Sequence, residues 1–225
     1  MTIVGPSIPY IPNIPNIPNI PNIPNIPVPG PLSQIGLFLQ IAKELLPLVI
    51  DVCKIIMNRP ENENAELIGL KAEKALEDGI KPDDFDSIGE YLDYLNEKIE
   101  IDKVKMDGLN ELDHYKYQAI GSGLYLVGVN QKLNITLTPT FWQCIATLGL
   151  EVNDAVNVIQ GLSKASFEDG SIIADYFKGD LQPGSREYRA IYNIIENMLN
   201  VKYPSLTDEE IEAKHQEFKN RLKEE

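Results

Sequence analysis

The hydrophobic pattern of residues 33–57 predicts a helix that is buried on most of its circumference. Most positions hold Ile, Leu, Val, Phe, Cys or Met, and the polar positions recur at intervals of three, four and seven residues. Such intervals place polar side chains on one narrow stripe of a helix. The favoured interpretation is a central helix of a bundle. The stripe comprises Gln40, Glu44, Pro47, Asp51, Lys54 and Asn58.

Two other interpretations of this segment stay open. One is a membrane-inserted or interfacial helix, and the other is an interface with a second molecule. A membrane span needs about 20 predominantly apolar residues. The segment carries four charged residues, Lys43, Glu44, Asp51 and Lys54, which disfavour a span.

Shorter amphipathic segments, separated by polar turns, follow along the chain. The last of them begins with a capping box, in which Thr207 and Glu210 satisfy each other's backbone amides. Strand signals are scarce, and 125–129 and 135–138 are the candidates. Helices are predicted over 65–78, 86–101, 139–148, 152–162 and 186–200, with a short helix inside 167–185 and a final helix after Thr207.

Residues 106–133 allow two interpretations. The segment forms one long helix, in which Gly121, Gly123 and Gly128 let a neighbour approach closely, or it breaks near Gly121 and continues as a strand over 125–129. Each glycine costs a helix interior about 1 kcal/mol relative to alanine. The helix is favoured, and the strand remains the alternative.

These elements predict a mainly α fold. We expect a multi-helix bundle of about seven to eight helices, preceded by an extended, polyproline II-like N-terminal arm. Residues 1–31 form the arm, and residues 32–225 form the helical domain.

The arm is built from seven Ile-Pro pairs spaced three residues apart, five of them followed by Asn. Proline fixes φ and disfavours the α conformation of the residue before it, so the predicted conformation is polyproline II. That helix has three residues per turn, which places every Ile on one edge of a rod roughly 65 Å long. An exposed apolar edge of this size is typical of an interaction site. The predicted partner-binding residues are Ile8, Pro9, Ile11, Pro12, Ile14, Pro15, Ile17, Pro18, Ile20, Pro21, Ile23, Pro24, Ile26 and Pro27. A low-complexity tail without a specific partner is the alternative.

Charge is segregated along the chain. Residues 1–42 contain no Asp, Glu, Lys or Arg, so the net charge of −14 is carried by the rest. Nucleic acid is disfavoured as a partner, because neutralising phosphates requires clustered Lys and Arg. An anionic membrane surface is disfavoured for the same reason.

Groups suited to catalysis are few. Cys53 and Cys144 lie among apolar residues and are expected to be buried thiols. His215, in the charged last helix, is expected to be solvated. His114 has Asp113 beside it, but adjacent residues of a helix do not face each other, so no catalytic pair is implied.

No cofactor or metal site is predicted. The acidic stretch at 83–90 fails the calcium-loop pattern, because Ile88 and Leu95 occupy ligand positions. Asp83, Asp84 and Asp86 are instead expected to serve the start of the following helix.

The sequence therefore favours a non-enzymatic structural, adaptor or cargo protein of a larger assembly, such as a virion or an injection or secretion apparatus. The arm is expected to bind a protein partner or sibling copies. Neither a signal peptide nor a membrane span is recognised, so we expect cytoplasmic synthesis, with incorporation into a particle or non-classical export left open. The alternatives are a secreted effector or membrane-active toxin that uses 33–57, and an enzyme of unrecognised type that uses His114.

Overall fold

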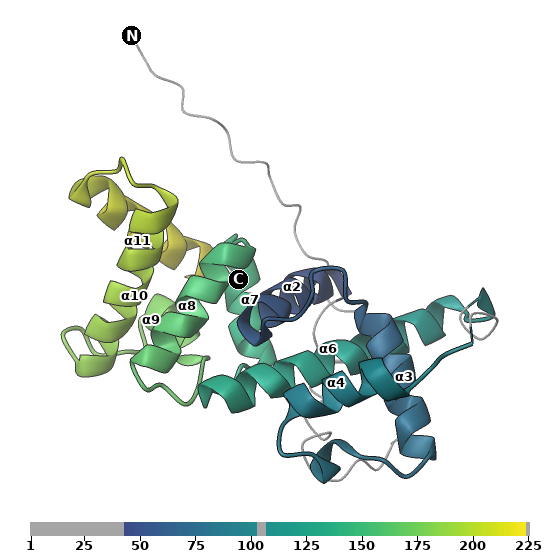
Figure 1. Ribbon diagram of the computed structural model, residues 1–225. Coiled ribbons are helices and arrows are strands. Elements are labelled where there is room, and N and C mark those ends of the chain that lie inside the picture. The colour runs from purple at the N-terminus through teal and green to yellow at the C-terminus, as the bar shows by residue number, and fades with distance from the viewer. Residues whose placement is uncertain (1–42, 103–106, 224–225) are drawn as a thin grey trace.

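The computed structural model describes residues 43–102 and 107–223, and the predicted arm lies outside this part of the chain (Figure 1). The mainly α prediction is confirmed. The described residues form nine α-helices, one or two more than the predicted seven to eight. The helices are α2 (Leu46–Met57), α3 (Ala65–Glu77), α4 (Ile88–Lys98), α6 (Glu111–Leu133), α7 (Pro139–Thr147), α8 (Val152–Lys164), α9 (Ile172–Lys178), α10 (Arg186–Lys202) and α11 (Asp208–Lys223), with short 3-10 turns η2 (Lys43–Leu45) and η3 (Pro82–Asp84).

Helix starts follow the local capping signals. Asn64, Ser87, Thr138 and Ser185 accept hydrogen bonds from the amides of the first turns of α3, α4, α7 and α10. The predicted capping box of α11 is also present, since Glu210 accepts from the amide of Thr207 and Thr207 accepts from that of Glu210. These five helices therefore begin within two residues of the predicted positions.

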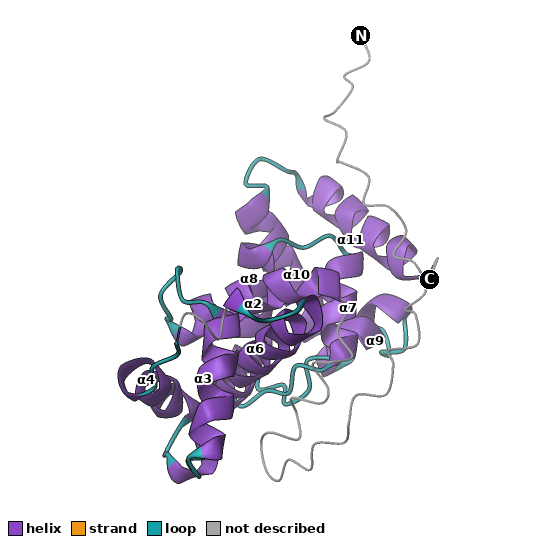
Figure 2. Ribbon diagram, turned by 90° about the vertical axis from the view of Figure 1, so that its right-hand side faces the viewer, coloured by secondary structure: helices purple, strands orange, loops and turns teal. Residues whose placement is uncertain are grey.

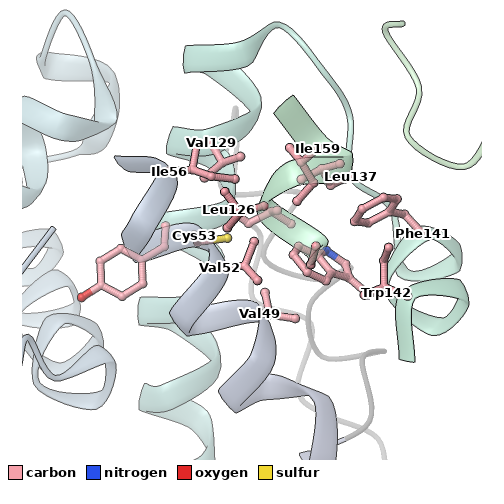
Figure 3. Packing of buried hydrophobic residues seen from close by; sticks show 14 of the residues in the cluster. Val49, Val52, Cys53, Ile56, Leu126, Val129, Leu137, Phe141, Trp142 and Ile159 are labelled. Atoms are coloured by element: carbon pink, nitrogen blue, oxygen red, sulfur yellow. The ribbon is translucent and has the colours of Figure 1, made fainter. Parts of the chain in front are cut away.

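α2 is the central helix, as predicted for the part of 33–57 that the structure describes. Figure 3 shows Val49, Val52, Cys53 and Ile56 of α2 facing side chains of α6, α7 and α8. The polar stripe is wrong at one position. Lys54 is buried, and its Nζ donates to the carbonyl of Glu61 at 2.7 Å. The neighbouring Ile55 is exposed instead, with 49% of its surface accessible.

Residues 111–133 of the ambiguous segment 106–133 form one continuous helix, so the strand alternative for 125–129 is wrong. α6 begins at the Asn110 cap and ends at Asn134, which adopts a left-handed conformation. The other strand candidate, 135–138, contributes a single parallel bridge between Thr136 and Asp169. Pro139 starts α7 directly after it, which leaves no length for a strand.

Of the three glycines named for α6, Gly121 provides the close approach of a neighbouring backbone that the sequence suggested. A Cβ built on Gly121 would lie 1.8 Å from the carbonyl oxygen of Ala65, and one built on Gly69 would lie 2.0 Å from that of Tyr117. Each helix thus presents a glycine to the backbone of the other. The packing of α3 on α6 offsets the conformational cost of these glycines.

The helices gather on two sides of α2. Figures 1 and 2 show α3, α4 and the first half of α6 on one side, and α8 to α11 on the other. One continuous cluster of buried hydrophobic side chains runs through all nine helices. Among the described helices, none is both long enough and apolar enough to cross a membrane.

Candidate functional site

The predicted docking residues of the arm, from Ile8 to Pro27, lie outside the described residues. The candidates that the structure does describe are groups of polar side chains on the helical body. Three such groups stand out: the His114 pair, a buried network around Glu63, and an aromatic cluster around His215.

His114 pairs with a carboxylate that is distant in sequence. Its Nδ1 lies 2.6 Å from Oε1 of Glu66 on α3, and 48% of the His114 side chain is exposed. The adjacent Asp113 does not contribute to the pair, because its carboxylate accepts from the amide of Asn110 in the α6 cap. A carboxylate that orients an imidazole is a feature of catalytic bases. Here, however, the pair is one of several polar side-chain contacts between α3 and α6.

Two further polar contacts between the same helices involve Glu73 of α3. Lys116 forms an ion pair with one of its carboxylate oxygens, and the hydroxyl of Tyr117 donates to the other at 2.6 Å. All three carboxylate contacts run from α6 to α3. These three contacts, which we call the His114 seam, hold α3 against α6. His114 is the most exposed of the residues that form them.

Glu63 is the centre of a buried polar network. Its side chain is 7% exposed, and the guanidinium of Arg59 binds both of its oxygens, with Nη2 to Oε1 at 2.6 Å. Tyr125 of α6 donates to Oε2 at 2.6 Å, and Asn96 of α4 donates to Oε1 at 2.6 Å. The carboxylate therefore joins α4 and α6 to the loop before α3.

Hydrogen bonding determines the charge state of this network. Burial alone raises the pKa of Glu63, but the bonds from Arg59 and Tyr125 outweigh burial and leave the pKa below its ordinary value. Burial and the bond to Glu63 raise the pKa of Tyr125 far above its usual range. Glu63 is therefore a stable carboxylate and Tyr125 a stable phenol, which suits a structural joint rather than proton transfer.

His215 contradicts the prediction that it is solvated. The side chain is 0% exposed, and the ring stacks on Tyr192 of α10 at 4.5 Å between centroids, 14° from parallel. Nδ1 lies 3.2 Å from the hydroxyl of Tyr176 on α9. The other ring nitrogen, Nε2, is buried and has no hydrogen-bond partner.

The sequence contained a signal for this burial. Ile211, His215, Phe218 and Leu222 follow one another at intervals of four, three and four residues, which is the spacing of one helix face. His215 therefore completes the apolar line of α11. Burial lowers the pKa of His215 to about 4, so the ring is neutral near pH 7.

Two surface cavities of the described body have volumes of about 320 Å³ and 230 Å³. The larger one lies at the end of α6, where Gln131 accepts from the amide of Ile88 and Asn130 accepts from that of Leu137. These amide side chains connect α6 to the elements beside it. The cavity is thus lined by groups with a structural role.

The remaining candidates also have structural roles. Cys53 and Cys144 are buried, as predicted, and burial raises the pKa of the Cys53 thiol far above its usual range. Asp84 accepts from the amide of Lys81 at the start of η3, while Ser87 caps α4. Across residues 43–102 and 107–223, no group of three or more His, Cys, Asp or Glu is arranged to hold a metal ion.

Comparison of the chain with protein-family models, with curated proteins and with solved structures gave no match.

Proposed function

We propose that the protein is a non-enzymatic structural, adaptor or cargo component of a larger assembly, and that its N-terminal arm binds the partner. The observation that carries this proposal is the Ile-Pro repeat of residues 8–27, which has the period of a polyproline II helix. An uncharged rod with an isoleucine edge is suited to a complementary apolar surface on another protein or on a sibling copy.

The surface of the described body supports the arm as the apolar binding element. Its exposed large hydrophobic side chains are Ile55, Leu76, Leu112 and Val201, each on a different helix. Single exposed apolar residues of this kind are normal for protein surfaces. The arm instead concentrates seven isoleucines at regular intervals, so as a polyproline II helix it would offer the larger continuous apolar surface.

The polar groups of the body support a non-enzymatic role. The His114 seam and the Glu63 network hold helices together, and the charge states of Glu63 and Tyr125 are stable near neutral pH. Such a body would carry or position the arm rather than transform a substrate. The toxin and enzyme alternatives stay predictions.

The proposal is tested on the full chain with two matched arm variants. One variant changes the seven isoleucines of the repeat to Ser, and the other changes the five asparagines of the repeat to Ser; both keep every proline and the length of the arm. In cells that produce the protein natively, we expect the wild type and the asparagine variant to sediment with a large assembly. We expect the isoleucine variant to sediment as free protein.

Backbone hydrogen exchange of the arm in the assembled fraction completes the test. The amides of Ile and Asn report on the arm, since proline has none. Slow exchange in the assembly and fast exchange in the isolated protein are expected. Identical sedimentation of all three proteins, or unprotected arm amides within the assembly, would refute the proposal.

A further inference from the structure

The last helix makes its apolar contacts with the body through one narrow line of side chains, and hydrogen bonds of Glu212, Lys219 and Arg221 flank that line. α11 is mostly charged, and its buried residues are Ile211, His215 and Phe218, with Leu222 partly buried. The Phe218 ring meets Phe177 of α9 edge-on at 5.9 Å. A histidine therefore occupies the middle of an otherwise apolar contact.

The surroundings of His215 accept a neutral ring and disfavour a charged one. Its Nδ1 faces a tyrosine hydroxyl, and its Nε2 is buried without a partner. A protonated imidazole needs acceptors for both N–H groups, and here Nε2 has no acceptor. A buried charge without such bonding is costly.

The charged neighbours of His215 lie on α11 itself. Lys219, one turn away, stands 5.1 Å from the centroid of the Tyr176 ring and repels an added positive charge. Glu212 attracts such a charge, but its carboxylate already accepts from Gln216 at 2.8 Å and from Tyr192 at 3.3 Å. Burial and Lys219 together outweigh the attraction of Glu212.

The other elements around α11 bring no compensating carboxylate to the ring. α9 contributes Tyr176, and α10 contributes Tyr192. The sequence of α7, PTFWQCIAT, contains no charged residue. Among the described residues, the groups facing His215 are therefore two tyrosines, Glu212 and Lys219.

We propose that α11 is an acid-releasable helix, which leaves α9 and α10 when His215 becomes protonated. Release would uncover Tyr176 and Phe177 of α9, both 0% exposed in the docked form. The rest of the body would keep its core. The result is a switch of surface chemistry, from a charged helix to an aromatic face.

Proton linkage gives the sign and the size of the effect of pH on the docking of α11. A histidine with a lowered pKa binds fewer protons in the docked state than in the released state, so stability of the docked state is lost as pH falls below about 6.5. With pKa values of about 4 when docked and 6.5 when released, undocking becomes more favourable by about 30-fold between pH 7.5 and pH 5.0.

The test compares backbone hydrogen exchange of α11 and α3 in the full chain at pH 7.5 and pH 5.0, corrected for intrinsic exchange rates. We expect protection of α11 to fall by about 30-fold at pH 5.0 while α3 keeps its protection. The variant His215→Phe retains the stack on Tyr192 without a titrating group, so its α11 should keep its protection at pH 5.0. The matched control His114→Gln changes the chain's other histidine and should behave as the wild type.

An NMR titration of the two imidazoles in the wild-type chain keeps the test decisive if His215→Phe does not fold. A His215 midpoint well below pH 6, together with the loss of α11 protection, supports the switch. Three results would overturn it: equal loss of protection in α3 and α11, acid release that persists in His215→Phe, or titration of His215 near pH 6.5 with α11 fully protected.

Discussion

Two buried titratable side chains of this protein have opposite charge states, although burial favours the neutral form of both. Glu63 stays charged because Arg59 and two further donors compensate the desolvation of its carboxylate. His215 stays neutral because it has one hydroxyl partner and a lysine nearby. The difference lies in the partners, and some of them come from other helices: Tyr125 and Asn96 for Glu63, and Tyr176 for His215. Residue type alone therefore does not predict the charge state.

The Glu63 network predicts that neutralising one carboxylate will lower the free energy of unfolding substantially. Glu63→Gln removes the charge that binds Arg59, whose side chain is only 10% exposed. We expect the free energy of unfolding to fall by about 2 kcal/mol or more at pH 7, because the guanidinium of Arg59 loses its buried partner and keeps only the exposed Asp93. Denaturant unfolding with an unchanged slope is the measurement.

The matched control for Glu63 is Asp93→Asn. Asp93 binds the same guanidinium, but its side chain is 63% exposed, so the expected loss is below about 1 kcal/mol. Because the pKa of Glu63 is lowered in the folded state, its contribution is present above about pH 4.5 and is lost as pH falls further. If Glu63→Gln and Asp93→Asn lowered the free energy of unfolding equally, Glu63 would not be the centre of the network.

At the scale of elements, the pairing of α3 with α6 depends on small residues at the crossing. Gly69 and Gly121 allow backbone atoms of the two helices to meet, and the polar seam of His114 and Glu73 runs beside them. α11 differs, since its apolar contacts come from one line of side chains with a histidine in it. Backbone contact makes the first joint intolerant of added volume.

Gly121→Ala should disrupt the α3–α6 crossing. The added methyl would overlap the carbonyl oxygen of Ala65, which is backbone and cannot move aside cheaply. We expect a loss of roughly 2 kcal/mol or more in the free energy of unfolding. Thermal and denaturant unfolding both measure it.

Gly89→Ala is the matched control within another helix. A Cβ there meets only the Ser87 hydroxyl at 3.6 Å, so alanine should stabilise α4 by about 0.5–1 kcal/mol. If both glycine variants changed stability in the same direction, the close approach at Gly121 would not be the cause.

At the scale of the whole molecule, one buried cluster connects helices that lie on both sides of α2. The charge distribution adds a second feature, since all of the net charge of −14 lies after residue 42. The acidic body and the uncharged arm are thus chemically distinct parts of one chain. The shared core predicts that the helical body unfolds cooperatively.

Unfolding at pH 7.5 should be a single transition. Trp142, the only tryptophan, is 0% exposed and lies in the cluster beside Phe141 (Figure 3). Its fluorescence and the far-ultraviolet circular dichroism of all helices should therefore show the same denaturant midpoint. Two separated midpoints would mean that the two sides of α2 unfold independently.

Much of the helical architecture was predictable because its signals are local. Ser, Thr and Asn caps, the Thr207–Glu210 box and the 3.6-residue periodicity act within a few residues, and they placed the helices close to their observed bounds. The continuity of α6 was ambiguous because the benefit of Gly121 comes from α3, more than 50 residues earlier. Local propensity contains no information about that contact.

The sequence by itself determined the order of the helices, the segregation of charge and the period of the N-terminal repeat, because each depends on neighbouring residues alone. Only the tertiary structure decided that Glu66 pairs with His114, that Tyr125 and Asn96 bind Glu63, and that Lys54 and His215 are buried. The physical reason is that burial and hydrogen-bond partners arise when helices distant in sequence pack together.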